Sequence, residues 1–414
     1  MERVTRPLAL ALMLIAAAPS QTRAYSVLAH EANIDALWEP AIRPLLQRRF
    51  ARATREELRA ARAFAYGGSV VQDLGYYPFG SHFFSNVLHY VRTGDFVETI
   101  IHDAKDLDEY AFALGTLAHY TADNVGHPEA VNKAVALLFP KLRAKYGDRV
   151  TYVDSPASHV IVEFSFDIVQ IAAGAYLPEK YHSFIGFEVA KPLLERAFRE
   201  TYGLDMKDVF GDEDLAMSTY RHSVSEIIPE LTRVAWRDKR EEIEWLMPGV
   251  KESAFIYSYT RQQYEKDFGR GYRKPGLLAR FIGFIYKLMP KIGPLKPLSF
   301  KAPTPEAETL FAESFKDTRA RYQTALDQVA RGRLDFTNTN FDVGRPTTHG
   351  EYSLADDTYA ELVHRLCDAK ASVPPALRAD IMRYYDRDAD RAHNINEKEQ
   401  KRAEKVRRQL SSLP

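Results

Sequence analysis

The chain has 414 residues, of which 45% are hydrophobic and 27% are charged, as in an ordinary globular protein with a large core. The 56 Lys and Arg residues balance 56 Asp and Glu residues, so the formal net charge is zero. Proteins that bind duplex nucleic acid usually carry a basic excess. The charge balance therefore argues against a stable duplex partner, but it is compatible with a small phosphate ester or a short single strand.

The first 24 residues have the three parts of a secretory signal peptide. Two arginines precede residues 8–18, an apolar run of 11 residues; Pro19 ends this run, and residues 22–24 place small side chains at the −3 and −1 positions. The alternative, a membrane anchor, needs ~20 apolar residues. We therefore expect cleavage after Ala24 and a secreted or periplasmic protein.

Apolar residues recur at three- and four-residue spacing through most of the chain, for example in residues 34–46, 109–120, 159–173 and 187–198. Extended alternating runs are scarce, and Gly and Pro fall between the helical runs. This pattern predicts an all-α protein.

The character of the sequence changes near residue 270. Residues 25–270 hold a dense set of histidines and aromatic residues, and residues 271–414 are predicted to be a helical C-terminal extension with a charged tail. Within it, residues 277–298 form an apolar run with four basic residues. This run could lie on a membrane surface as an amphipathic helix, or it could be a core helix that ends at Pro290.

The histidines are concentrated near the N-terminus, with seven of the twelve in the first 163 residues. The sharpest motif is His119-Tyr-Thr-Ala-Asp123-Asn-Val-Gly-His127, which places all three ligand-type side chains on one helix face. Along the helix axis the two histidines would be ~12 Å apart, whereas a zinc–nitrogen bond is only ~2 Å. They are therefore predicted to bind different ions, with Asp123 between them able to bridge two metals.

Two further clusters have the same character. His159 and Glu163 are i, i+4 neighbours on a helix face that is otherwise apolar, a spacing at which a nitrogen and an oxygen can hold one divalent ion. Cleavage after Ala24 would free the α-amino group of Tyr25, which could chelate a metal together with its carbonyl oxygen, and His30 would complete that site.

The fourth cluster begins at Asp73, which precedes an aromatic loop. Either His82, placed in the loop, or His89, on the next helix, could join Asp73 at a metal. The aromatic loop residues are Tyr76, Tyr77 and Phe79. Together with His82, they could contact a choline-like headgroup or a nucleobase, or they could pack the junction between helices.

Each cluster alone has a structural explanation, because a single His or Asp on an apolar helix is often a satisfied structural residue. Four clusters of ligand-type residues within 140 residues instead indicate a multinuclear metal site.

Taken together, these motifs resemble the zinc-dependent phospholipase C family, which is related to the P1/S1-type single-strand nucleases. That family is all-helical and holds three zinc ions. The resemblance implies that Tyr25, through its amino nitrogen and carbonyl oxygen, and His30 bind one zinc, with Asp123 bridging to a second. It implies that Asp73, His89 and His119 complete the second site, and that His127, His159 and Glu163 hold the third. The family usually begins with tryptophan, and its gap between the residues matching Asp123 and His127 is often longer.

The resemblance implies hydrolysis of a phosphodiester, most of all by a phospholipase C acting on a phospholipid. We expect the chain to be a monomer. Two adjacent ions can lower the pKa of a shared water toward ~7, and a third can accept a phosphate oxygen. Asp73 and Asp123 are the expected catalytic residues, Asp73 as a base. Glu163 resembles the phospholipase branch, whereas the Tyr25-to-His30 spacing resembles the nuclease branch. A P1/S1-like single-strand nuclease or 3′-nucleotidase, and a non-catalytic exported zinc-binding protein, are the alternatives.

Overall fold

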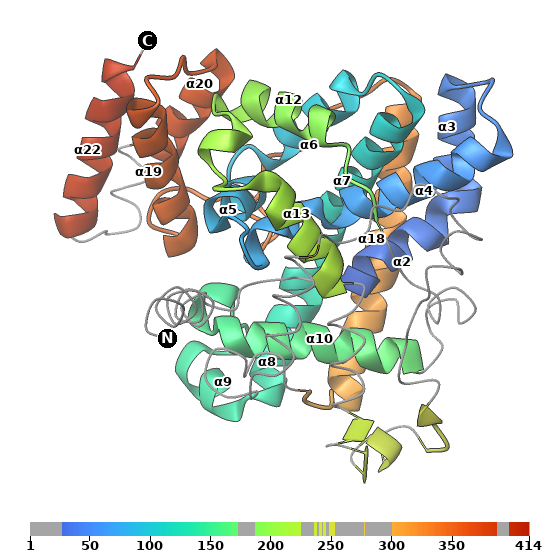
Figure 1. The fold of residues 1–414 in the computed structure, drawn as a ribbon. Coiled ribbons are helices and arrows are strands. Elements are labelled where there is room, and N and C mark those ends of the chain that lie inside the picture. Colours follow the sequence, from blue (N-terminus) through green and yellow to red (C-terminus); the bar gives the residue numbers. More distant parts are fainter. Residues whose placement is uncertain are drawn as a thin grey trace, which may run out of the picture.

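The computed structural model describes residues 27–172, 187–224, 300–386 and 397–413, residue 277, and short pieces between 236 and 252. These residues fold into helices without a β-strand, and an isolated bridge pairs Asn340 with Arg345. The predicted all-α class is confirmed (Figure 1). The predicted signal peptide, Tyr25 and residues 278–298 lie outside the described residues.

The order of the helices follows the chain. The first group is α2 (Val27–Leu37), α3 (Arg43–Arg49), α4 (Arg55–Val70), α5 (His82–Tyr90), α6 (Thr93–Asp103), α7 (Leu107–Gly126), α8 (Asn132–Leu138), α9 (Pro140–Tyr146), α10 (Pro156–Ala172), α12 (Lys191–Tyr202) and α13 (Glu213–His222). The C-terminal group is α18 (Pro305–Ala330), α19 (Ser353–Asp368), α20 (Pro375–Tyr384) and α22 (Glu397–Ser412). Among these described helices, none is both long enough and apolar enough to cross a membrane.

Local sequence signals explain where the central helix α7 begins and ends. The Asp106 side chain accepts a hydrogen bond from the Glu109 N–H at 2.8 Å and so caps the first turn. The α-helix ends at Gly126 and continues as a π-helical turn, His127–Val131, which contains Pro128. The regular α-helix therefore stops next to His127.

One helical run begins later than its apolar pattern predicts. Residues 187–190 are not helical, and α12 starts at Lys191 with Pro192 in its first turn. Proline suits that position because its missing N–H would have no helical partner there. The N–H of Glu188 instead donates to the carbonyl of Ala63 on α4 at 3.0 Å.

Helices α4 and α7 pack backbone against backbone at the centre of the fold. Glycine at positions 68 and 115 makes this possible, because a Cβ on Gly68 would lie 1.9 Å from the Phe112 carbonyl oxygen. A Cβ on Gly115 would lie 2.1 Å from the Ala65 carbonyl oxygen. This close approach brings the end of α4 beside the polar residues in the middle of α7.

The described C-terminal helices pack onto the N-terminal ones. Helix α18 runs beside α7 (Figure 1), and the Tyr322 hydroxyl donates to the Leu114 carbonyl at 2.9 Å. The charged tail contains a helix, α22, whose buried Ala403, Val406 and Leu410 face α19. One buried apolar cluster joins residues from both halves of the chain. The domain boundary near residue 270 stays a prediction.

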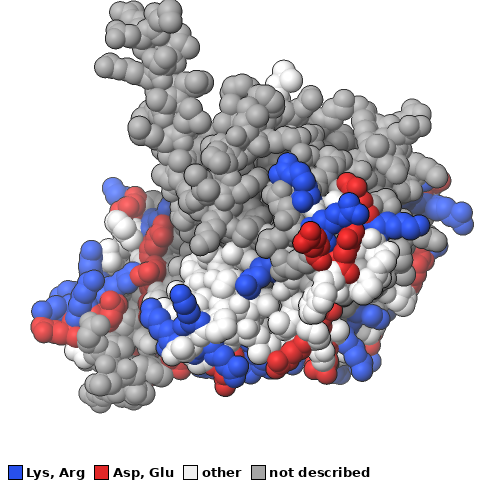
Figure 2. Space-filling model, turned by 90° about the horizontal axis from the view of Figure 1, so that it is seen from below, with Lys and Arg blue, Asp and Glu red and all other residues white. Residues whose placement is uncertain are grey.

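Charges of both signs are mixed on the face that Figure 2 shows. Lys and Arg alternate with Asp and Glu around a patch of uncharged residues, and the described part of this face has no continuous basic tract. This agrees with the balanced composition of the whole chain.

We predict that Gly115→Ala destabilises the fold by at least about 2 kcal/mol, because the added methyl group must push α4 and α7 apart. Urea denaturation followed by circular dichroism measures the change. Gly211→Ala is the matched control, because a Cβ at Gly211 meets no atom within 4 Å. Equal stability of the two variants would contradict the close packing of α4 on α7.

Candidate metal centre

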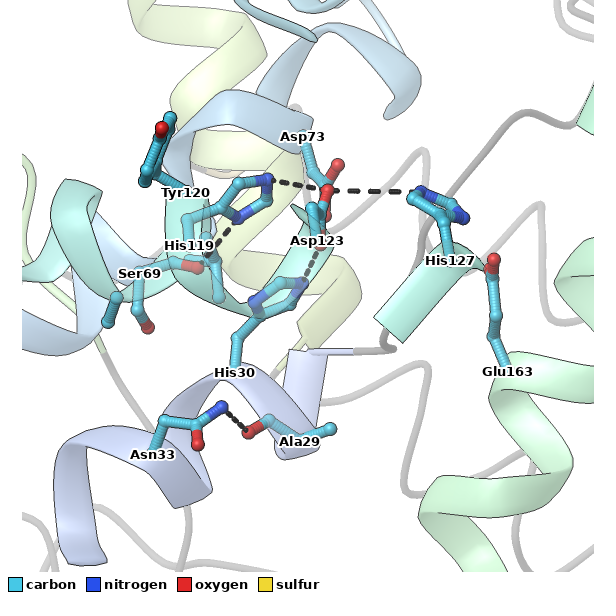
Figure 3. Close-up of polar contacts among 12 residues, drawn as sticks. Ala29, His30, Asn33, Ser69, Asp73, His119, Tyr120, Asp123, His127 and Glu163 are labelled. Atoms are coloured by element: carbon cyan, nitrogen blue, oxygen red, sulfur yellow. Dashed lines mark hydrogen bonds and ion pairs between the residues drawn. The ribbon is translucent and has the colours of Figure 1, made fainter. Parts of the chain in front are cut away.

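Five side chains from four separate segments meet at α7. His119 and Asp123 lie on α7, His30 on α2, His89 on α5, and Asp73 on the 3₁₀ segment Val71–Tyr76 that follows α4. Figure 3 shows His30, Asp73, His119 and Asp123 pointing toward one another from these elements. All five side chains are buried.

The Asp123 carboxylate lies at the junction of three histidines. Its Oδ1 lies 3.4 Å from His30 Nε2, and its Oδ2 lies 3.1 Å from His119 Nε2 and 3.3 Å from His89 Nε2. His89 Nε2 also lies 3.5 Å from Asp73 Oδ1. Two ligand atoms bound to one tetrahedral zinc at ~2.0–2.1 Å lie about 3.3–3.4 Å from each other. The spacing therefore fits ligands that share ions, with the two oxygens of Asp123 facing different histidines.

The inward-facing atoms of this cluster have unused hydrogen-bonding capacity. In the described part of the chain, both oxygens of Asp73 and Asp123 and the Nε2 atoms of His89 and His119 make no hydrogen bond. Buried polar atoms are nearly always paired, and a buried carboxylate is costly without a compensating charge. Bound cations would satisfy these atoms, so the residues present fit a metal centre.

The outward-facing ring nitrogens are held by backbone carbonyls. His119 Nδ1 donates to the Ser69 carbonyl at 2.9 Å, and His89 Nδ1 donates to the Ser85 carbonyl at 2.7 Å. A carbonyl oxygen can only accept, so each Nδ1 carries the proton and Nε2 presents its lone pair to the cluster. Such outer hydrogen bonds fix the tautomer and orientation of metal-binding histidines.

A second group of ligand atoms gathers beyond the end of α7. Ligand atoms of His127, His159 and Glu163 lie within 4.8 Å of one another, and His159 Nδ1 lies 3.4 Å from Glu163 Oε1. His159 Nε2 donates to the Val150 carbonyl at 2.9 Å, which leaves Nδ1 for the group. The structure thus places His127 and His119 in different groups, as the axial separation along α7 predicts.

Burial and crowded charge shift the pKa values of the histidines in the cluster. Burial lowers the pKa of His30 and His159 to about 4, and it lowers the pKa of His127 well below its usual range. These rings are therefore neutral at neutral pH, as metal binding requires.

Nearby carboxylates raise the pKa of His89, in contrast to the lowered pKa values of the other three rings. Burial opposes its charged form, but Asp123 and Asp73 outweigh burial and raise the pKa of His89 to about 9. The two carboxylates thus make this part of the cluster a place where positive charge is stabilised, which also favours a bound cation.

The residues predicted to contact substrate are divided between core and surface. Tyr77 is only 6% exposed and its ring centre lies 3.9 Å from that of Tyr220, so it packs the helix junction. Phe79 is 45% exposed. His82 is the first residue of α5 instead of a loop residue, and its half-buried ring lies 6.2 Å from the ring of half-buried Tyr76. Asp73 groups with His89 and not with His82.

The structure adds a segment that the sequence did not single out. The Phe341 N–H donates to the His89 carbonyl at 3.1 Å, and Asp342 Oδ1 lies 3.3 Å from His127 Nδ1. Both residues follow α18 and belong to the predicted C-terminal extension. Their local sequence, Asn340-Phe-Asp-Val-Gly344, has the polar and glycine residues of a turn but no ligand spacing that would have revealed the contact.

Asp123→Asn should cost the protein at least one equivalent of zinc, because an amide offers one good ligand oxygen where the carboxylate offers two. Zinc per chain, measured by mass spectrometry after dialysis, tests this expectation. Asp148→Asn, at an exposed surface ion pair with Arg143, should retain the wild-type content. Full zinc occupancy in a folded Asp123→Asn variant would exclude the bridging role.

Comparison with known proteins supports the metal centre. Residues 34–212 match the family described as zinc-dependent phospholipase C. The search of curated proteins and the search of solved structures returned no match. The matched segment contains Asp73, Asp123 and the group of His127, His159 and Glu163, whereas His30 lies just before it. This match over residues 34–212 supports a zinc-dependent phosphoric ester hydrolase of the phospholipase C type.

Proposed function

We propose that this protein is a phospholipase C that uses three zinc ions to hydrolyse a phospholipid at the phosphodiester next to the glycerol. The observation that carries the proposal is the placement of Asp123, whose two buried oxygens face different histidines inside the family domain. A bridging carboxylate of this kind suits neighbouring metal ions that act on one phosphate.

The three groups of ligand atoms support three ions. His30, His119 and Asp123 form one group, and Asp73, His89 and His119 form the next. We assign His119 to the second ion, so that the first ion takes His30, one oxygen of Asp123 and the main-chain nitrogen and oxygen of Tyr25. His127, His159 and Glu163 hold the third ion.

Zinc in such a site supplies a water of lowered pKa and positive charge for the phosphate oxygens. The chain supplies the geometry. Asp73 lies fully buried, with Oδ1 facing His89, and is placed to accept the proton released from the attacking water. Backbone carbonyls hold His119 and His89 in one orientation, so the reacting groups need little rearrangement. Phe79 and His82 are the residues we assign to the substrate side.

Two observations favour a lipid over a nucleic acid as substrate. The third group uses Glu163, which resembles the phospholipase branch of the family. The balanced charge of the chain, 56 Lys and Arg against 56 Asp and Glu, gives no basic excess that would attract a polyanionic strand. The spacing from Tyr25 to His30 favours the nuclease branch, so single-strand nuclease or 3′-nucleotidase activity is the second candidate.

We expect the purified mature protein to hydrolyse a chromogenic phosphocholine ester and to lose this activity on treatment with a chelator. Added zinc should restore it. Single-stranded DNA and 3′-nucleotides, assayed in parallel with and without chelator, should remain uncleaved. Activity on only these two substrates would instead establish the nuclease candidate. If the protein retains zinc but hydrolyses none of these three substrates, it is a non-catalytic zinc-binding protein.

We also propose that the chain is exported and cleaved after Ala24, because the Tyr25 α-amino group is then free to bind the first ion. N-terminal sequencing of the protein from its native host should begin at Tyr25. A preparation with one extra residue before Tyr25 should hold one zinc fewer than the mature protein, since an amide nitrogen is a poor ligand. Equal zinc contents would rule out the main-chain site.

A further inference from the structure

We propose that Asp342, in the turn after α18, is the positioning residue that orients His127 for the third metal ion. The inference rests on the proposed zinc-binding function and extends the site beyond the segment that matches the family, which ends at residue 212. The same carboxylate would make the C-terminal part of the chain a component of the metal centre.

The contact joins two buried atoms that have complementary roles. His127 Nδ1 and Asp342 Oδ1 lie 3.3 Å apart, the two side chains are 3% and 1% exposed, and neither atom has a hydrogen-bond partner elsewhere in the described structure. A carboxylate oxygen accepts, so this pairing places the proton of His127 on Nδ1.

The other nitrogen of His127 points toward the metal ligands. Nε2 lies 3.9 Å from Asp123 Oδ2, and the close-up in Figure 3 shows the ring facing Asp123. With Nδ1 protonated, Nε2 keeps its lone pair for a metal ion. His89, His119 and His159 show the same division, one nitrogen inward and one held from outside, but backbone carbonyls hold those three.

Asp342 is itself held rigidly, which a positioning residue requires. Its Oδ2 accepts hydrogen bonds from the Tyr152 N–H at 3.1 Å and from the Tyr352 hydroxyl. Its carbonyl accepts from the Asn132 side chain at 2.8 Å, and its N–H donates to the Asn340 side chain at 3.0 Å. The Oδ1 atom is left for His127.

The geometry favours an outer partner over a fourth ligand. Asp342 belongs to none of the three described groups whose ligand atoms lie within 4.8 Å of one another. A carboxylate behind a metal-bound histidine makes the ring more basic and fixes its orientation, and losing such a partner typically costs 10–100-fold in metal affinity. The third ion should therefore depend on Asp342 while the first two do not.

Asp342→Asn tests the proposal because the amide is nearly the same size but removes the charge. Zinc-loaded wild type and variant are equilibrated with a graded series of chelator concentrations, and bound zinc per chain is measured. One zinc should leave the variant at roughly 10–100-fold lower chelator than in wild type, while the other two titrate as before. Circular dichroism verifies the fold. Asp335→Asn, at an exposed position in the same segment, should match wild type.

Two further variants identify the ion and guard against misfolding. Glu163→Gln should lower the affinity for the same, third ion. The double variant with Asp342→Asn should therefore still bind the other two ions as the wild type does. Tyr352→Phe removes one hydrogen bond to Asp342 and should lower the affinity for the third ion to a smaller extent. This variant tests the inference if Asp342→Asn fails to fold. If a folded Asp342→Asn protein retains zinc as the wild type does, the inference about Asp342 is wrong, while the proposed function stands. If only Tyr352→Phe folds, wild-type zinc retention in that variant has the same meaning. A wild-type chain that binds no zinc overturns the proposed function and this inference with it.

Discussion

The buried negative charge of Asp123 is the constraint on which the metal centre depends. Its side chain is fully buried in the last turn of α7, and three imidazole nitrogens lie 3.1–3.4 Å from its oxygens. Neutral imidazoles do not compensate the negative charge of a carboxylate. A second carboxylate, that of Asp73, adds to the excess of negative charge. The pKa of His89, which these two carboxylates raise to about 9, reflects this excess. Divalent cations would offset all of it and would also use the lone pairs that burial leaves without hydrogen bonds.

The surrounding helices are arranged so that this polar centre is held from outside. Close packing of α4 on α7 through Gly68 and Gly115 places the Ser69 carbonyl behind His119. The turn after α18 contributes from the far end of the chain, where Phe341 bonds the backbone of His89 and Asp342 contacts His127. Stability of the fold and organisation of the site are therefore coupled, because the same contacts that pack the helices orient the ligands.

Sequence reasoning recovers the parts of the site that local geometry determines. His119 and Asp123 lie on α7, and His127 begins the helical turn that continues it. Helical periodicity predicts the spacing of these residues and that of His159 and Glu163, and the structure separates His119 from the group of His127, His159 and Glu163 accordingly. No periodicity could bring α2 and α5 to α7, because tertiary packing decides that; only resemblance to the family joined these clusters. Neither helical periodicity nor the family resemblance could identify Asp342. No other ligand-type residue lies three or four residues away from it, and it lies outside the matched segment.

A crystal structure of the mature protein with anomalous diffraction at the zinc edge would test the central claim most directly. The account predicts three anomalous peaks within one buried centre. Two of them should flank Asp123, and the third should lie among His127, His159 and Glu163. Zinc found only at surface positions, or an Asp123 carboxylate that contacts no metal, would contradict the account.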